Sequence, residues 1–206
     1  MHRTKSIFTL NISNIAPYIP FIFFTVIFVI GVLIGCLSVG NFESLISYAS
    51  DEITEFISLR KNSGFYELLK SSVFSVFSIY IVLFLCGTSV VGCVVSPFVL
   101  LYKGFTYGCL SGYLYFTYKL EGIMLNSLLI IPSVLISVFG LIILGKEAFS
   151  FSYLLSGICI KSNKPINIYA QFKIYCIKSL TTLIAAVISV IFDLGMSVLF
   201  LNFFNL

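Results

Sequence analysis

Residues 85–145 read LCGTSVVGCVVSPFVLLYKGFTYGCLSGYLYFTYKLEGIMLNSLLIIPSVLISVFGLIILG, and this stretch decides the fold class. Its only charged residues are Lys103, Lys119 and Glu121. A helix needs about 20 apolar residues to cross the hydrocarbon core of a bilayer, so the stretch is long enough for more than one crossing. Its apolar runs are solid rather than alternating, which predicts helices and not the strands of a β-barrel.

The composition of the whole chain agrees with a membrane protein. Of its 206 residues, 59% are apolar and 10% are charged, and the mean hydropathy is +1.10. An ordinary soluble domain carries about 25% charged residues. A chain of this size could not hide so much apolar surface in one core, so a soluble globular protein is excluded, as are disordered, collagen-like and coiled-coil chains.

Tracts without charged residues predict five transmembrane helices in a single membrane domain of residues 1–206. The fold class is therefore an all-α polytopic bundle with additional interfacial amphipathic helices. We place the turn between the second and third spans at Ser96-Pro97, because proline disfavours helical geometry at the preceding residue. A re-entrant hairpin is the alternative for these two spans. The predicted spans are 21–39, 72–95, 98–118, 122–145 and 180–203.

Lysine and arginine indicate the orientation, because they accumulate on the cytoplasmic side of membrane proteins. With the N-terminus cytoplasmic and the C-terminus extracytoplasmic, eight of them lie inside and four outside. An alternative for the first span is a lipoprotein signal, since residues 33–36 (LIGC) look like a lipobox before Cys36. The inside residues are Arg3, Lys5, Lys103, Lys146, Lys161, Lys164, Lys173 and Lys178, and the outside ones are Arg60, Lys61, Lys70 and Lys119.

Two connecting segments are patterned. The outer amphipathic loop, residues 40–71, repeats apolar residues at three- and four-residue steps, as one face of a helix does. This face either lies on the outer membrane surface or docks an extracytoplasmic partner, and the opposite face is acidic. The inner basic loop, residues 146–179, is expected to bind anionic lipid. The outer apolar face consists of Phe42, Leu45, Ile46, Ile53, Phe56 and Ile57.

Polar residues inside the predicted spans are rare and therefore informative. Asp193 lies midway through the fifth span, where an ionised carboxylate costs several kcal/mol. Asp193 either belongs to an ion relay or makes a structural or subunit contact, and we favour the contact. Asn126 and Ser133 on the fourth span are candidate donors to a protonated Asp193. Lys103 lies early in the third span and is expected to snorkel to the surface.

Glycines repeat at four-residue spacing in two of the spans. Gly104, Gly108 and Gly112 lie on one face of the third span, and Gly31 and Gly35 do the same in the first. Such spacing lets a second helix approach closely. The glycines are therefore expected to form a packing seam, either within the bundle or with another subunit.

The sequence contains few residues of the types that carry out catalysis. The single histidine is His2, and the metal-protease, nucleophile-elbow and phosphate-loop motifs are absent. We therefore expect no enzyme activity, no metal and no cofactor. Nucleic acid is a poor partner for a chain with so modest a charge. The six cysteines form no CxxC pair and are interpreted as small apolar residues.

The stretch quoted first resembles the stage II sporulation protein M family. In that family a glycine-bearing span leads through a proline to Lys-Gly-Phe, a glycine repeat, a short outer turn and a proline-bearing fourth span. Unlike many relatives, this chain has no proline in its last acidic segment, residues 192–195 (FDLG). The matching residues are Gly87, Gly92, Pro97, Lys103, Gly104, Phe105, Gly108, Gly112, Gly122 and Pro132.

The resemblance implies a function that composition does not. Family members belong to the stage II sporulation D, M and P complex in the mother-cell membrane, which thins septal peptidoglycan for engulfment of the forespore. The D and P proteins are the hydrolases, and the M protein is the membrane scaffold that holds them. The alternative is a small permease or channel subunit, such as the membrane part of an ABC-type exporter, with Asp193 and Lys103 lining a path.

Overall fold

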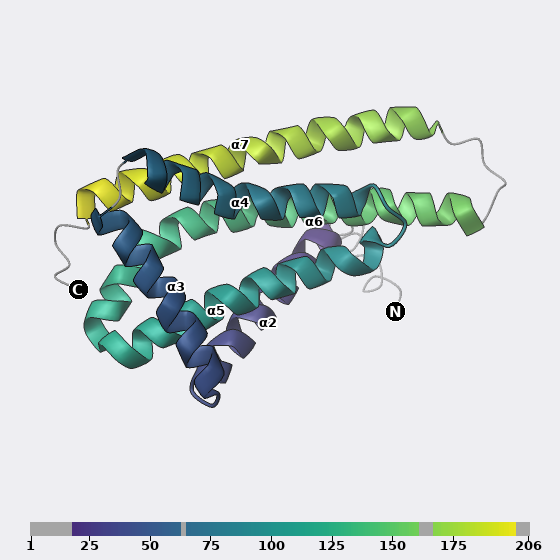
Figure 1. Cartoon of the computed structure of the whole chain (residues 1–206). Coiled ribbons are helices and arrows are strands. Elements are labelled where there is room, and N and C mark those ends of the chain that lie inside the picture. Colours follow the sequence, from purple (N-terminus) through teal and green to yellow (C-terminus); the bar gives the residue numbers. More distant parts are fainter. Residues whose placement is uncertain (1–17, 63–64, 161–166, 201–206) are drawn as a thin grey trace, which may run out of the picture.

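The computed structural model describes residues 18–62, 65–160 and 167–200, and these are helical almost throughout (Figure 1). The predicted all-α class is confirmed. The basic residues Arg3, Lys5, Lys161 and Lys164, the single histidine and the end of the fifth predicted span lie outside the described residues. The elements are α2 (Ile19–Val39), α3 (Glu43–Asn62), α4 (Phe65–Gly87), α5 (Gly92–Leu125), the π-helical turn η2 (Asn126–Ile130), α6 (Ile131–Ile160) and α7 (Ile168–Phe200).

Four helical stretches are long and apolar enough to cross a membrane, and one of them is bent back on itself. The stretch Gly92–Cys159 has 68 residues and reverses at Lys119, where φ is 47° and ψ is −117°. Its two arms lie side by side, because the backbone N–H of Cys93 donates to Ser152 Oγ (2.8 Å) and the Leu100 side chain lies against Gly145. This hairpin therefore supplies the third and fourth predicted spans.

Neighbouring passes run in the directions that repeated membrane crossing requires. The Tyr80 hydroxyl of α4 donates to the Ser137 carbonyl of α6 (2.9 Å), and Gly87 lies against Ala148, so α4 and α6 run in the same direction. The Ser189 hydroxyl of α7 donates to the Ser133 carbonyl of α6 (2.8 Å), and the rings of Tyr175 and Phe151 stack 5.0 Å apart, so α7 runs opposite to α6. Consecutive passes thus alternate in direction.

Apolar residues form both the core and much of the surface. Phe24, Leu83, Leu100 and Leu144 are fully buried at the centre, where α2, α4, α5 and α6 meet. Large apolar side chains also cover the outside of α2, α4, α5, α6 and α7. A surface of this kind is stable in contact with lipid and not with water. Together with the four long apolar helices, it makes the chain a multi-pass membrane protein.

The predicted turn at Ser96-Pro97 is wrong. The turn between α4 and α5 comprises Thr88–Val91, and Pro97 lies inside α5 near its beginning. Ser152 of α6 closes this turn by donating to the carbonyl oxygens of Ser89 (2.7 Å) and Val90 (3.0 Å). Pro97 is the sixth residue of α5, so it removes one backbone hydrogen bond inside the helix, a loss that transmembrane helices tolerate. Both α4 and α5 have the length of a full crossing.

The two predicted loops are mostly helical. The outer segment, residues 40–71, forms α3 and the first turns of α4. The inner segment, residues 146–179, continues α6 to Ile160 and begins α7 at Ile168. The start of α7 is capped, because the backbone N–H of Ala170 donates to Asn167 Oδ1 (3.2 Å). The helices thus extend well beyond the predicted spans at this end of the bundle.

Candidate functional site

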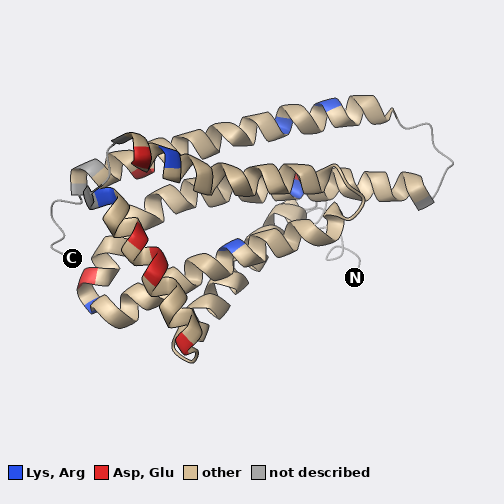
Figure 2. Cartoon of the chain, viewed as in Figure 1, with Lys and Arg blue, Asp and Glu red and all other residues tan. Residues whose placement is uncertain are grey.

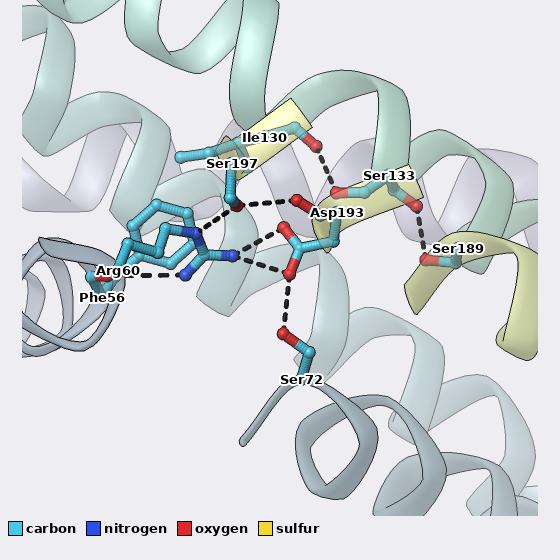
Figure 3. Close-up of polar contacts among 8 residues, drawn as sticks. All are labelled: Phe56, Arg60, Ser72, Ile130, Ser133, Ser189, Asp193 and Ser197. Atoms are coloured by element: carbon cyan, nitrogen blue, oxygen red, sulfur yellow. Dashed lines mark hydrogen bonds and ion pairs between the residues drawn. The ribbon is translucent and has the colours of Figure 1, made fainter. Parts of the chain in front are cut away.

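An ion pair between α3 and α7 is the most polar feature of the described structure (Figure 3). Arg60 Nη2 lies 2.6 Å from Asp193 Oδ1 and 2.7 Å from Oδ2. The side chains are only 7% and 15% exposed, respectively. The pair therefore lies in a nearly water-free environment, where each charge depends on the other.

Two serines and a phenylalanine complete the bonding of the pair. The Ser72 hydroxyl of α4 donates to Asp193 Oδ2 (2.7 Å), and Arg60 Nε donates to Ser197 Oγ (2.8 Å). The Ser197 hydroxyl in turn donates to the Asp193 carbonyl (2.7 Å), and the guanidinium lies 3.3 Å from the centre of the Phe56 ring. We call Arg60, Asp193, Ser72, Ser197 and Phe56 the outer clamp, because they join α3 to α4 and α7.

Amphipathic periodicity of α3 places Arg60 in the clamp. Ala49 and Ile53 are buried, and Ile53 packs with Leu114 and Leu125 on the two sides of the Lys119 reversal. Arg60 follows Ile53 by two helical turns on the same side of α3. Its side chain therefore lies beyond the Lys119 reversal and contacts α7. The outer clamp, the Lys119 reversal and α3 lie at one end of the bundle, which we call the α3 end.

Charge and burial act on Arg60 in opposite directions. Burial lowers the pKa of the Arg60 guanidinium, and the Asp193 carboxylate beside it raises the pKa. An arginine has so high an initial pKa that it keeps its proton in proteins. The outer clamp is therefore a charged hydrogen-bond network, and its geometry holds a helix in place rather than a substrate.

The predicted donors to Asp193 are wrong. Asn126 Nδ2 donates instead to the Tyr115 hydroxyl (2.6 Å), and Ser133 donates to the carbonyl of Ile130 (3.1 Å). Asp193 also lies close to the end of α7 rather than midway through a span, because α7 begins at Ile168. The sequence analysis counted Arg60 among the basic residues outside the membrane and did not predict that Arg60 pairs with Asp193. The available signal was that a buried acid in a membrane protein needs a counter-charge, and few cations flank the spans.

The five predicted glycines form one seam between α2 and α5. A Cβ atom at Gly31 would lie 2.5 Å from the carbonyl oxygen of Leu101, and one at Gly35 would overlap the backbone of Phe105. On the other helix, a Cβ atom at Gly104 or Gly108 would overlap carbonyl oxygens of α2, and one at Gly112 would lie 3.1 Å from such an oxygen. The structure thus places the seam within the chain, where the two parallel backbones touch.

Lys103 and Asn126 lie apart from the outer clamp. Lys103 is partly buried on α5, 16 residues before the Lys119 reversal, and enters none of the ion pairs found among the described residues. Asn126 is buried at the start of η2, where its Oδ1 finds no hydrogen-bond partner in the described structure. Together with Asp193, these residues form three separate polar positions rather than a continuous chain.

The two faces of α3 differ in charge. Ile53 is buried and Ile57 partly so, whereas Phe42 and Ile46 of the predicted apolar face are exposed, and Leu45 and Phe56 are partly buried. Figure 2 shows acidic residues gathered along α3, while the lysines of α7 lie toward the opposite end of the bundle. The exposed acidic residues of α3, which we call its acidic face, are Glu43, Asp51, Glu52 and Glu55.

A scan against protein-family models and searches of curated proteins and of solved structures gave no match to this chain. Among the residues that the structure describes, no group of three or more His, Cys, Asp or Glu side chains could hold a metal ion.

Proposed function

We propose that this chain is a non-catalytic membrane scaffold that holds extracytoplasmic peptidoglycan hydrolases at the membrane during engulfment of a forespore. The resemblance of residues 85–145 to the stage II sporulation protein M family supplies this role. In such a complex the partners carry out hydrolysis, and the scaffold supplies position. The membrane would be that of the mother cell.

The observation that carries the proposal is the attachment of α3 by the outer clamp. A short amphipathic helix on a membrane surface is ordinarily free to shift, because it is held only by lipid contacts. Here Arg60 is bonded to Asp193 and Ser197 of α7, and Ser72 of α4 donates to the same Asp193 carboxylate. The acidic face of α3 is thereby held in one orientation relative to the bundle, which is what a docking surface requires.

Charge supports an extracytoplasmic position for α3. The opposite end of the bundle carries Lys146 and Lys178, both paired with Glu147 (3.5 and 2.8 Å), and Lys173 lies on the same segment of α7. Counted over the whole sequence, eight Lys and Arg residues are assigned to this side and four (Arg60, Lys61, Lys70 and Lys119) to the α3 side, so the accumulation of these residues on the cytoplasmic side favours this end inside the cell and the α3 end outside. Hydrolases that act on the cell wall would meet the acidic face there.

Affinity purification of the full-length chain from sporulating cells tests the scaffold role. We expect peptidoglycan hydrolases to be recovered with the chain. Replacing the acids of α3 (Asp51→Asn, Glu52→Gln and Glu55→Gln together) should reduce that recovery. Glu121→Gln is the matched control, because Glu121 is an exposed acid at the same end but outside α3. Recovery of the intact chain without any hydrolase would contradict the proposal.

A second candidate, the membrane subunit of an exporter, is favoured by Lys103 alone. A partly buried cation without an ion-pair partner in the described part of a membrane helix is a common feature of transport paths. Asp193 does not favour the same path, because its carboxylate is already bonded to Arg60 and Ser72. Co-purification of a cytoplasmic ATPase, with loss of transport in Lys103→Met, would support the exporter over the scaffold.

A further inference from the structure

Two unpartnered oxygen atoms lie inside the hairpin, between α5 and η2. Asn126 is 1% and Ser111 is 6% exposed, and neither Asn126 Oδ1 nor Ser111 Oγ has a hydrogen-bond partner among the described residues. The Tyr107 hydroxyl lies beside both side chains, but it bonds to neither of these oxygens. Buried polar atoms are almost always hydrogen-bonded, because leaving one unpaired is costly. The two oxygens therefore indicate a binding site for a further polar group.

Helical spacing brings the polar side chains of this site together. Tyr107, Ser111 and Tyr115 follow one another at four-residue steps, so they share one side of α5. Asn126 reaches the same side from η2, because its Nδ2 donates to the Tyr115 hydroxyl (2.6 Å). We call these four residues the hairpin cluster. Its members belong to two elements that follow each other along the chain across the Lys119 reversal.

The π-helical turn begins at Asn126 itself. The backbone N–H of Ile131 bonds to the Asn126 carbonyl, which lies five residues earlier rather than four. A turn of this kind adds one residue to the helix and shifts its phase, and π-turns are frequent at functional sites. The backbone carbonyl of Asn126 is thus already bonded, whereas the oxygen of its side chain is available to a ligand.

The hairpin cluster lies below the membrane surface. Ser111 precedes the Lys119 reversal by eight residues, which corresponds to about 12 Å along a helix. Each leaflet contributes about 15 Å of hydrocarbon. The outside of the hairpin also carries exposed apolar side chains at this depth, such as Phe116 and Met124. A partner for the two oxygens must therefore be a bound molecule and not bulk solvent.

The chemistry of the four side chains selects the bound molecule. Asn126 Oδ1 is only an acceptor, so the ligand must donate a hydrogen bond or carry positive charge, and an anion does neither. A cation would bring an uncompensated charge, because all four residues of the cluster are neutral and an isolated charge is very costly in hydrocarbon. Water donates two hydrogen bonds and accepts others, so one molecule can satisfy both oxygens.

We propose that the hairpin cluster binds one water molecule, which donates to Asn126 Oδ1 and is hydrogen-bonded to Ser111 Oγ and the Tyr107 hydroxyl. Buried waters in proteins ordinarily make about three hydrogen bonds to groups that are otherwise unpaired. The water joins α5 to η2, since Ser111 belongs to the first and Asn126 to the second. This inference does not depend on the scaffold role.

Thermal unfolding of the full-length protein in detergent tests the site through the sign of one substitution. With the water bound, Ser111→Ala should lower the melting temperature by about 2–4 °C, because the water loses a partner. Without the water, the same variant should raise the melting temperature, since it removes an unpaired buried hydroxyl. Ser179→Ala is the matched control and should change little, because the Ser179 hydroxyl bonds only to a carbonyl of its own helix, that of Cys176 (2.9 Å).

A double-mutant cycle with Asn126→Leu tests whether one molecule joins the two side chains. The two unpartnered oxygens share no direct hydrogen bond. Ser111→Ala should therefore cost less in the Asn126→Leu protein, where the water has already lost a partner. Tyr107→Phe takes the place of Asn126→Leu if that variant does not fold.

A crystal structure of the full-length protein should show a water within about 2.7–3.2 Å of both Asn126 Oδ1 and Ser111 Oγ. A higher melting temperature for Ser111→Ala, or strictly additive losses in the cycle, would overturn the proposal. So would a direct hydrogen bond between Ser111 and Asn126 in the crystal structure.

Discussion

At the scale of single residues, Arg60 and Asp193 are the two charges that the bundle can least tolerate losing. Both are largely buried, and each has the other as its ionic partner. Removing one partner of a buried pair leaves the second charge uncompensated, which costs more than the pair itself contributes. A single substitution should therefore lower the free energy of unfolding by more than the net contribution of the ion pair.

Arg60→Gln and Asp193→Asn should each lower the free energy of unfolding by about 3–5 kcal/mol. The double variant should lose less than the sum, because it leaves no isolated charge. Thermal unfolding of all four proteins in one detergent measures the coupling. Strictly additive losses would mean that the two side chains do not interact in the folded protein.

Lys119 is the residue whose backbone conformation reverses the long hairpin. With φ at 47° and ψ at −117°, it occupies a region that glycine adopts readily and other residues adopt at a cost of about 1–3 kcal/mol. Lys119→Gly should therefore raise the melting temperature, whereas Lys119→Ala should leave it nearly unchanged. A lower melting temperature for the glycine variant would show that the turn has a different geometry.

At the scale of elements, the α2–α5 seam joins the first pass to the third through backbone contact. The helices approach so closely that added methyl groups would meet carbonyl oxygens on both sides of the seam. Close parallel packing of this kind is stabilised by van der Waals contact rather than by the hydrophobic effect, since lipid tails are as apolar as the helices. The seam is therefore sensitive to the smallest increase in side-chain size.

Gly108→Ala should destabilise the protein, because its new Cβ atom would overlap the backbone of Val32. Gly195→Ala is the matched control on α7, where no atom of the described residues lies within 4 Å of the added atom. That variant should be neutral or stabilising by about 0.5–1 kcal/mol, since alanine favours the helix. The melting temperature should fall in Gly108→Ala and stay the same or rise in Gly195→Ala. A rise in both variants would contradict the close contact of the α2 and α5 backbones.

Local patterns in the sequence predicted the helices but not the contacts that connect them. Gly104, Gly108 and Gly112 share a face because of helical periodicity alone, so their packing role was accessible. The turn at Thr88–Val91 was missed because Pro97 is a stronger local signal, and the turn is closed by Ser152 of another helix. The partner of Asp193 was missed for a similar reason, since 133 residues separate it from Arg60.

At the scale of the whole molecule, the charges define two unlike ends. The α3 end carries the acidic face and the outer clamp, while the opposite end carries the lysines of α6 and α7. Because consecutive helices alternate in direction across the membrane, the two ends of the bundle lie on opposite sides of it. The side of the membrane occupied by one end therefore determines the side occupied by the other.

Labelling of single cysteines in intact cells tests the orientation. In a variant without the six natural cysteines, Asp51→Cys on α3 should react with a membrane-impermeant maleimide, and Lys173→Cys on α7 should not. Both positions are exposed, so accessibility to the reagent depends on the membrane alone. Labelling at Lys173→Cys without labelling at Asp51→Cys would reverse the proposed topology.

Outer-clamp geometry also sets an order for biosynthesis. Ribosomes release α3 into the membrane long before α7 exists, so Arg60 waits through the synthesis of 133 further residues for its carboxylate. Until then the guanidinium has no ionic partner within the bundle, and α3 is not attached to α7. An incomplete translation product that stops before Asp193 would thus display an unanchored α3. Completion of the last helix is what converts a loose surface segment into a fixed part of the assembly.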